Sequence, residues 1–214
     1  MRKSTAAPLL LAAALLAAGC APDHSTTADS AAAPTPPGHS GQSLWHVIDA
    51  DGKTITQLPD DDPVVTVVRK TVVLHSGAVD NRAYRTIADS AAQEFAFYNA
   101  DFADALRAQH YDAGLADLFT TNHLATHQTD IAWYQSTFPK DMKTAKVEMD
   151  STIEFTAADQ SYLDTNKFEL HRPYTQHRTV SLALAHGKWA IVAIEKGRLT
   201  RQAPTLPKPT TSPS

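Results

Sequence analysis

The chain has little cysteine and no excess of basic residues, and each shortage excludes a class of protein. Its single cysteine, Cys20, rules out an internal disulfide, a cysteine-rich zinc site and a redox pair of thiols. Lys and Arg number 19 against 23 Asp and Glu, a formal charge of −4, so we expect no nucleic-acid partner. The eight glycines are scattered and form no phosphate-binding loop. We therefore expect no cofactor.

Residues 1–19 have the pattern of a cleaved signal peptide. Arg2 and Lys3 precede an apolar stretch, residues 9–16, that is too short to span a bilayer of about 30 Å. The stretch ends in Ala17-Ala18-Gly19-Cys20, and residues 16–20 resemble the lipobox of bacterial lipoproteins. The resemblance implies cleavage before Cys20 and lipid attachment to its sulfur. The protein would then sit on the extracytoplasmic face of the cell membrane, held by its lipid anchor; an ordinary secretory signal with an incidental cysteine is the alternative.

Two segments have the composition of disordered chain. Residues 21–42 contain no Leu, Ile, Val, Met or aromatic residue, and four prolines lie among Ala, Ser, Thr and Gly. Such a segment buries too little apolar surface to offset its chain entropy, which predicts a disordered stalk over residues 20–42. Residues 201–214 are similar and predict a disordered tail. The remaining length is ample for one hydrophobic core.

Residues 43–80 predict a small β-rich segment. The apolar residues of 44–48 and 53–58 flank Asp49-Ala-Asp-Gly52, a turn composition typical of a hairpin. Residues 64–74 are a run of β-branched side chains, which predicts a strand or a bent pair of strands.

The following residues have helical periodicity. A stripe spaced four or three residues apart predicts one amphipathic helix over residues 82–109: Ile87, Ala91, Phe95, Tyr98, Phe102 and Leu106. Glu94 lies on another face of this helix, where we expect an exposed side chain. Possible caps at residues 120–122 predict a second helix, with Leu124, Ile131 and Phe138 as its buried stripe.

The last sixty residues predict antiparallel strands. Residues 145–155 alternate between apolar and polar side chains, which is typical of a half-buried strand, and residues 167–171 predict a second one. His186-Gly187 joins residues 178–185 and 188–195 in a tight hairpin. Because residues 189–194 are apolar on both faces, we expect a central strand there.

This order of elements resembles the nuclear-transport-factor-2-like superfamily, the cystatin-like α+β cone. The residues that carry the resemblance are Phe95, Tyr98, residues 101–106, residues 115–119 and residues 187–192. It implies an α+β fold over residues 81–200, in which a long N-terminal helix packs in a curved antiparallel sheet with a pocket at the wide end. The superfamily includes isomerases, dehydratases and pure binding modules, so the fold assigns no chemistry.

Few residue patterns indicate a site. Ser151 is the one polar residue on the apolar face of residues 145–155, and Tyr98 and Tyr134 could add hydroxyl groups to a pocket. We find no carboxylate at an inward position, so we name no catalytic residue. His123 and His127 would share a helix face with Asp130, but they border the polar side, so we expect no metal. We interpret His171 and His177 as parts of a polar loop.

These observations favour a non-catalytic binding or assembly module of the bacterial cell envelope. Its expected partner is an envelope protein or a small apolar ligand. The alternative is a cone-pocket enzyme of the isomerase or dehydratase kind, which would need an acid–base pair inside the pocket.

Overall fold

The computed structural model describes residues 43–202, which form an α+β fold with five helices and eight strands. The α+β class is thus confirmed. The signal peptide predicted for residues 1–19, the stalk predicted for 20–42 with Cys20, and residues 203–214 of the tail lie outside the described residues. No helix in the described part is long and apolar enough to cross a membrane.

The elements follow the order β1 (Trp45–Ile48), β2 (Thr54–Leu58), α1 (Pro63–Asp80), α2 (Ile87–Phe95), α3 (Ala100–Ala108), α4 (Tyr111–Thr121), β3 (Ala125–Trp133), β4 (Ser136–Pro139), β5 (Thr144–Ala157), α5 (Gln160–Asn166), β6 (Pro173–Ala185), β7 (Lys188–Lys196) and β8 (Thr200–Arg201).

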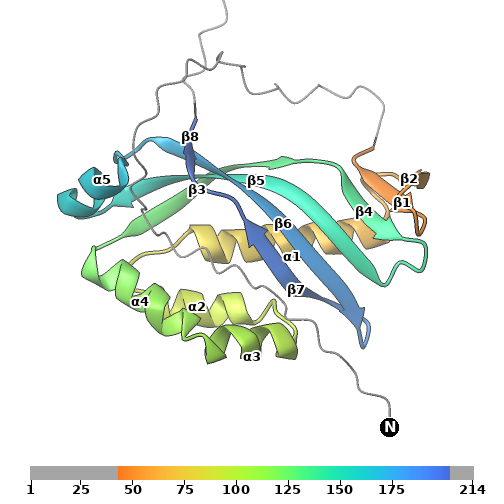
Figure 1. The fold of residues 1–214 in the computed structure, drawn as a ribbon, viewed down its shortest axis with the longest axis horizontal. Coiled ribbons are helices and arrows are strands. Elements are labelled where there is room, and N and C mark those ends of the chain that lie inside the picture. Colours follow the sequence, from red (N-terminus) through yellow and green to blue (C-terminus); the bar gives the residue numbers. More distant parts are fainter. Residues whose placement is uncertain (1–42, 203–214) are drawn as a thin grey trace, which may run out of the picture. The chain divides into compact units, whose positions relative to one another are not determined.

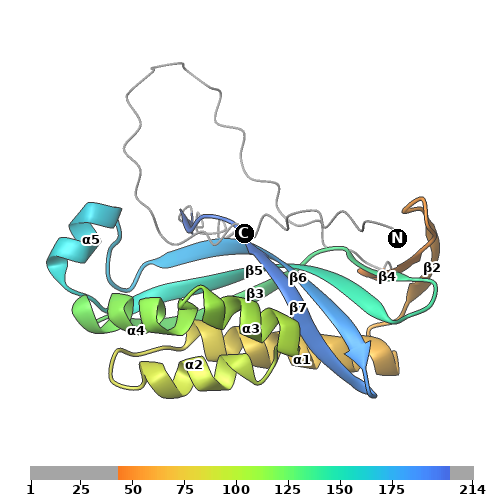
Figure 2. The same ribbon diagram turned by 60° about the horizontal axis from the view of Figure 1, so that its bottom comes forward.

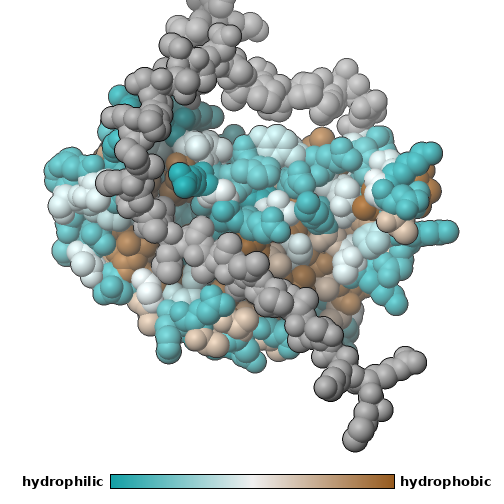
Figure 3. Space-filling model, viewed as in Figure 1, coloured by the Kyte–Doolittle hydropathy of each residue, from teal (hydrophilic) through white to brown (hydrophobic). Residues whose placement is uncertain are grey.

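All the strands belong to one mixed sheet. Its strand order is β2-β1-β4-β5-β6-β7, with β3 also paired to β5 and β8 to β6. Only β1 and β4 pair in parallel. Helix α1 crosses one face of the sheet, and α2, α3 and α4 lie on that same side (Figures 1 and 2). On the face seen in Figure 3, polar surface predominates, with apolar patches near the β6–β7 end.

The core lies between α1 and the sheet. Its most completely buried aliphatic side chains come from both layers: Val65, Val68, Val72, Val147, Met149, Leu182 and Ile191. A second cluster joins α4 and α5 to the far ends of β5 and β6, around Phe155 and Tyr174. The two clusters anchor both ends of the long strands.

Residues 64–74, which we predicted to be a strand, form most of helix α1. Asp62 caps this helix, because its carboxylate accepts hydrogen bonds from the backbone of Val64 at 2.8 Å and of Val65 at 3.3 Å. Pro63 occupies the first turn, a position that suits proline. Val65, Val68 and Val72 follow at helical spacing and are buried. These start signals and the packing against the sheet outweigh the strand preference of valine.

Residues 82–109, which we predicted to be one helix, contain two helices, α2 and α3. The chain leaves the helix at residues 96–99 and pairs with the edge of β7. The backbone N–H of Ile191 donates to the carbonyl of Phe97 at 2.8 Å, and the N–H of Asn99 donates to the carbonyl of Ile191 at 2.9 Å. Asn99 then caps α3 through its side chain, which accepts from the backbone N–H of Phe102 at 3.0 Å. The predicted apolar stripe is therefore divided between two helices, because the chain is not helical at residues 96–99.

The helix predicted after residues 120–122 does not form. Those residues end α4 or follow it, and the segment beyond forms β3 and β4. Strand β3 pairs antiparallel with β5, with bulges near Ala125 and Gln128. The seven-residue spacing of Leu124, Ile131 and Phe138 suggested a helix only because bulges and a strand break disturb the period of two.

The β-strand predictions are mostly confirmed. The hairpin of β1 and β2 forms, with Trp45 opposite Leu58, and β5 contains the alternating residues 145–155. His186 and Gly187 both have positive φ, 51° and 74°, as a two-residue hairpin requires. Three details were wrong. Residues 167–171 precede β6 and form no strand of it, β7 ends the strand order and is not central, and Arg201 of the expected tail pairs with Tyr174.

Candidate functional site

The interior of the domain contains a buried ion pair between helix and sheet. Asp80 is the last residue of α1, and Arg178 projects from β6. Nη2 of Arg178 donates to Oδ1 of Asp80 at 2.6 Å and Nη1 donates to Oδ2 at 2.8 Å. Both side chains are almost completely buried, at 3% exposure each. The pair therefore joins α1 to the sheet in one fixed geometry.

Three further donors complete the environment of Asp80. Its Oδ2 accepts from the hydroxyl groups of Ser151 at 2.6 Å and Ser76 at 2.9 Å, and from the amide of Gln128 at 2.9 Å. Gln128 comes from β3 and also donates to Ser151 at 2.9 Å. The predicted pocket residue Ser151 is therefore inside the domain, where it donates to a charged carboxylate.

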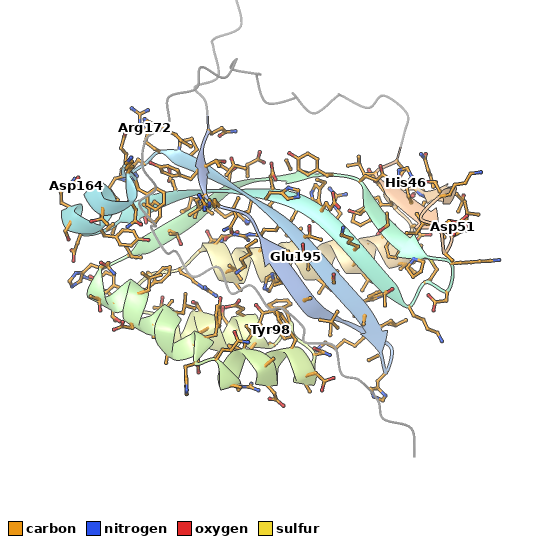
Figure 4. All side chains as sticks on the ribbon, in the orientation of Figure 1. His46, Asp51, Tyr98, Asp164, Arg172 and Glu195 are labelled. Atoms are coloured by element: carbon orange, nitrogen blue, oxygen red, sulfur yellow. The ribbon has the colours of Figure 1, made fainter. Side chains whose placement is uncertain are left out.

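A second buried ion pair lies between the loop after α1 and helix α2. Arg82 donates through Nη2 to Oε2 of Glu94. The other carboxylate oxygen of Glu94, Oε1, accepts a hydrogen bond from the hydroxyl of Tyr98. The hydroxyl of Tyr111, from α4, lies 3.1 Å from Oε1 and 3.3 Å from Oε2. Tyr98 also lies 3.1 Å from Nε2 of His75. It is labelled in Figure 4, on the helical side of the sheet next to β7.

These surroundings fix the protonation states of the acids. Burial alone would raise the pKa of Asp80, but Arg178 and the hydrogen bonds from Ser151 and Ser76 outweigh burial and lower it. Burial likewise opposes the charge of Glu94, but the charges of Arg82 and Lys196 and the hydrogen bond from Tyr98 together outweigh it, so the pKa of Glu94 is also below its usual value. Both carboxylates are therefore ionised at neutral pH.

The other groups of the cluster respond mainly to burial. Burial lowers the pKa of His75 to about 3 and keeps its imidazole neutral. Burial and the charge of Glu94 raise the pKa of Tyr98 above its usual value, and raise that of Tyr111 to about 12. Lys196, at the end of β7, is half-buried, and burial lowers its pKa to about 8 despite the opposing charge of Glu94.

This arrangement is better suited to holding charges than to moving protons. A general acid or base works best when its pKa lies near the operating pH. Asp80, Glu94, His75 and Tyr98 all have pKa values moved away from neutrality, and the carboxylates are occupied by arginine and hydroxyl donors. Among the shifted groups of the cluster, Lys196 alone has a pKa close to neutrality.

Part of this cluster was predicted from the sequence. Tyr98 and Ser151 are buried in it, at different ion pairs, but Tyr134 is elsewhere. Tyr134 donates to Oδ2 of Asp150 at 2.7 Å, on the sheet face that also carries His177. The expectation that no carboxylate points inward was wrong, because Asp80 and Glu94 are buried. Glu94 was expected on the surface because it lies beside the apolar stripe, not on it.

The histidines are placed differently from the prediction. His123 lies in the turn after α4 with a φ of 49°, and its Nδ1 is 3.0 Å from Oδ2 of Asp159. His127 is exposed on β3, so the two histidines do not share a helix face. His177 is in β6 and not in a loop. Among residues 43–202, no group of three or more His, Cys, Asp or Glu is arranged to hold a metal ion.

A surface groove lies outside this cluster. It has a volume of about 280 Å³ and is bounded by α1, by the link between α2 and α3, and by the β6–β7 hairpin. Val67 and Leu74 of α1, Phe97 of the link and Trp189 of β7 supply most of its apolar lining, and Lys70 and Lys188 add two ammonium groups. The lining of the groove is therefore mostly apolar, and its two charged side chains are both positive.

Comparison with solved structures finds distant structural likeness. No protein family model matches the chain, and no curated protein matches it. Among solved structures, the chain resembles an IcmL-like type IV secretion system protein from Legionella pneumophila. The sequence identity is 10%, the TM-score is 0.45, and the match covers 68% of this chain and 96% of the other.

Proposed function

We propose that this chain is a lipid-anchored, extracytoplasmic binding module of the bacterial cell envelope, and that its domain binds a partner without catalysing a reaction. The observation that carries the proposal is the state of the buried cluster. Both of its carboxylates are paired with arginine, and its histidine is neutral and hydrogen bonded. A cluster held in this way stabilises a rigid domain and offers no free acid–base pair.

We also propose that the domain belongs to the nuclear-transport-factor-2-like superfamily. The antiparallel run of β5, β6 and β7 over helices on one face supports this assignment. The helix that packs most closely on the sheet is α1, which begins before the predicted boundary at residue 81. The domain would therefore include α1, and its interior would be filled by the two ion pairs.

The lipid anchor rests on the sequence pattern that ends at Cys20. Cell fractionation of the wild-type chain and of Cys20→Ser tests it. We expect the wild-type chain in the membrane fraction, with a mass that shows diacylglycerol on Cys20. The Cys20→Ser variant should be released or remain unprocessed. Recovery of mature, unacylated wild-type chain only from the medium would overturn the anchor.

The enzyme alternative is tested by native mass spectrometry of the purified chain. A cone-pocket enzyme retains or accepts a small organic molecule inside the domain, near Lys196 and Glu94. A co-purified molecule whose binding is lost in Lys196→Met, while the groove variant Leu74→Glu still binds it, would favour the enzyme. We expect no such molecule in the interior.

A further inference from the structure

Helix α1 has a second apolar stripe, which is half-exposed and borders the groove. Val65, Val68 and Val72 are fully buried on its inner side. On the opposite side, Val67 is 49% exposed and Leu74 is 51% exposed, with Thr71 between them. Positions i, i+4 and i+7 lie on one face of a helix. The described residues therefore leave about half of the Val67 and Leu74 side chains of this outer stripe exposed.

The groove described above runs beside this outer stripe. Phe97 and Trp189 form the wall opposite Val67 and Leu74. The wall is rigid for two reasons: the backbone of Phe97 is hydrogen bonded to Ile191, and Trp189 is buried against Phe138 with its ring centroid 6.3 Å away. A firm wall on one side and an exposed helix stripe on the other form a preorganised concave surface.

The charged residues of the groove have one sign. Lys70 and Lys188 line it from opposite sides, and no acidic side chain does. The whole chain carries a formal charge of −4, so this positive site contrasts with the rest of the protein. The groove therefore selects an occupant that is apolar along its centre and acidic at its edges.

We propose that the groove binds an amphipathic helix of an envelope protein, with acidic residues flanking its apolar stripe. The inference rests on the proposed function, because it names the class of partner for that binding module. The spacing of Val67, Thr71 and Leu74 is that of a helix ridge, against which a second helix packs with its own i, i+3 and i+4 side chains. A flat lipid surface does not fill a concave groove, and the net negative charge of the chain opposes an anionic leaflet.

The test uses the full chain carrying Cys20→Ser, which removes the expected lipid without changing residues 43–202. Two synthetic helical peptides of about four turns share the same leucine stripe and differ only in flanking residues, glutamate in one and lysine in the other. Fluorescence anisotropy measures their binding. We expect the glutamate peptide to bind more tightly, and its affinity to fall as the salt concentration rises.

Two sets of variants locate the binding. Leu74→Glu places a carboxylate in the groove and should weaken the glutamate peptide at least about tenfold. Its matched control is Ile55→Glu, because Ile55 is equally exposed, at 52%, but lies on β2. The double variant Lys70→Glu/Lys188→Glu should reverse the preference in favour of the lysine peptide. Lys53→Glu, in the β1–β2 turn, is its control. Melting curves confirm that each variant is folded, and the double variant provides the test if Leu74→Glu is not.

Several results would overturn the proposal. A dissociation constant above about 1 mM for the glutamate peptide would overturn it. Equal affinities for the two peptides would overturn it as well. Sedimentation with phosphatidylglycerol vesicles that depends on Leu74 would assign the groove to lipid. A dimer of the wild-type chain that Leu74→Glu dissociates would assign it to a second copy. Because none of these readouts requires the lipid anchor, failure of the anchor at Cys20 is distinguished from failure of the groove.

Discussion

The guanidinium of Arg178 on β6 donates to both carboxylate oxygens of Asp80 at the end of α1. The two residues are 98 positions apart in the sequence. Because the two contacts are parallel, they fix both the distance and the rotation of the helix relative to the strand. Ser151 and Gln128 reach the same carboxylate from β5 and β3. One carboxylate thus connects α1 to three strands.

The first prediction concerns this pair. Asp80→Ala leaves the Arg178 charge buried without a partner, so we expect it to lower the free energy of unfolding by about 3–5 kcal/mol. Replacing both residues with Asp80→Leu and Arg178→Met removes both charges and should cost less than the single change. Urea denaturation measures both values. An Asp80→Ala cost below about 1 kcal/mol would show that the pair does not hold the helix to the sheet.

The second prediction concerns Glu94 and corrects the expectation of a surface position. Glu94→Ala removes the acceptor of Arg82, Tyr98 and Tyr111 and leaves a buried guanidinium unpaired. We expect a loss of about 3–5 kcal/mol in the free energy of unfolding.

Gln93→Ala is the matched control for Glu94→Ala, because Gln93 is the preceding residue on α2 and is exposed. It should change stability by no more than about 0.5 kcal/mol. Equal urea midpoints for the two variants would contradict the buried position of Glu94.

How far the sequence predicts this fold depends on what determines each element. Strand β5 is half-buried, so its residues 145–155 alternate between apolar and polar side chains and predict the strand. The β6–β7 hairpin is predicted by the turn residues His186-Gly187. Helix α1 was missed because its valines favour a strand, although Asp62-Pro63 was a readable start signal. The break at residues 96–99 was not readable, since it depends on pairing with Ile191, far along the chain.

The buried cluster was readable only in part. Arg178 lies two residues from Val180 and four from Leu182, so the alternation of β6 places it on the buried face. The buried position of the Arg178 side chain could therefore have been predicted from the alternation of β6. Asp80 and Glu94 gave no such signal, because a charged residue beside an apolar helix stripe usually faces water. Only the tertiary placement of Arg82 and Arg178 shows why these carboxylates are stable inside.

The third prediction is a dependence of stability on pH. The pKa of His75 falls to about 3 in the folded chain, below its ordinary value of about 6.5. The unfolded chain therefore binds more protons between these values, and stability decreases as the pH falls from about 6.5 towards 3. The slope from one such group is at most about 1.4 kcal/mol per pH unit.

His75→Gln keeps a polar side chain next to Tyr98 but cannot titrate. We expect urea midpoints of this variant to depend less on pH between about 6 and 5 than those of the wild type. His127→Gln, an exposed position on β3, is the control and should follow the wild type. At lower pH both variants should still lose stability, because the lowered pKa values of Asp80 and Glu94 stabilise the fold only while these carboxylates are ionised. Identical slopes for His75→Gln and wild type would show that His75 is not buried in its neutral form.

The fourth prediction separates two phenylalanines that the sequence placed on one buried stripe. Phe102 on α3 is buried, with its ring centroid 4.8 Å from that of Tyr98. Phe102→Ala should therefore cost about 3–5 kcal/mol. Phe95 is only half-buried, and the guanidinium of Arg107 covers its ring at 4.9 Å. Phe95→Ala should cost about 1–2 kcal/mol. Equal losses in urea denaturation would contradict the different burial of the two rings.

The last prediction tests whether residues 63–80 form a helix. The carboxylate of Asp62 accepts from the backbone N–H groups of Val64 and Val65, which have no partner within the helix. Asp62→Ala removes this cap and should lower the free energy of unfolding by about 0.5–2 kcal/mol, whereas Asp62→Asn keeps an acceptor oxygen and should recover most of the loss. Asp61→Ala, at the exposed preceding residue, is the control for a lost negative charge near the helix start. If residues 64–74 were a strand, Asp62 would cap nothing, and the three variants would have the same urea midpoint. A graded series, with Asp62→Ala lowest and the other two close to wild type, is expected because only that variant leaves two backbone donors without their acceptor.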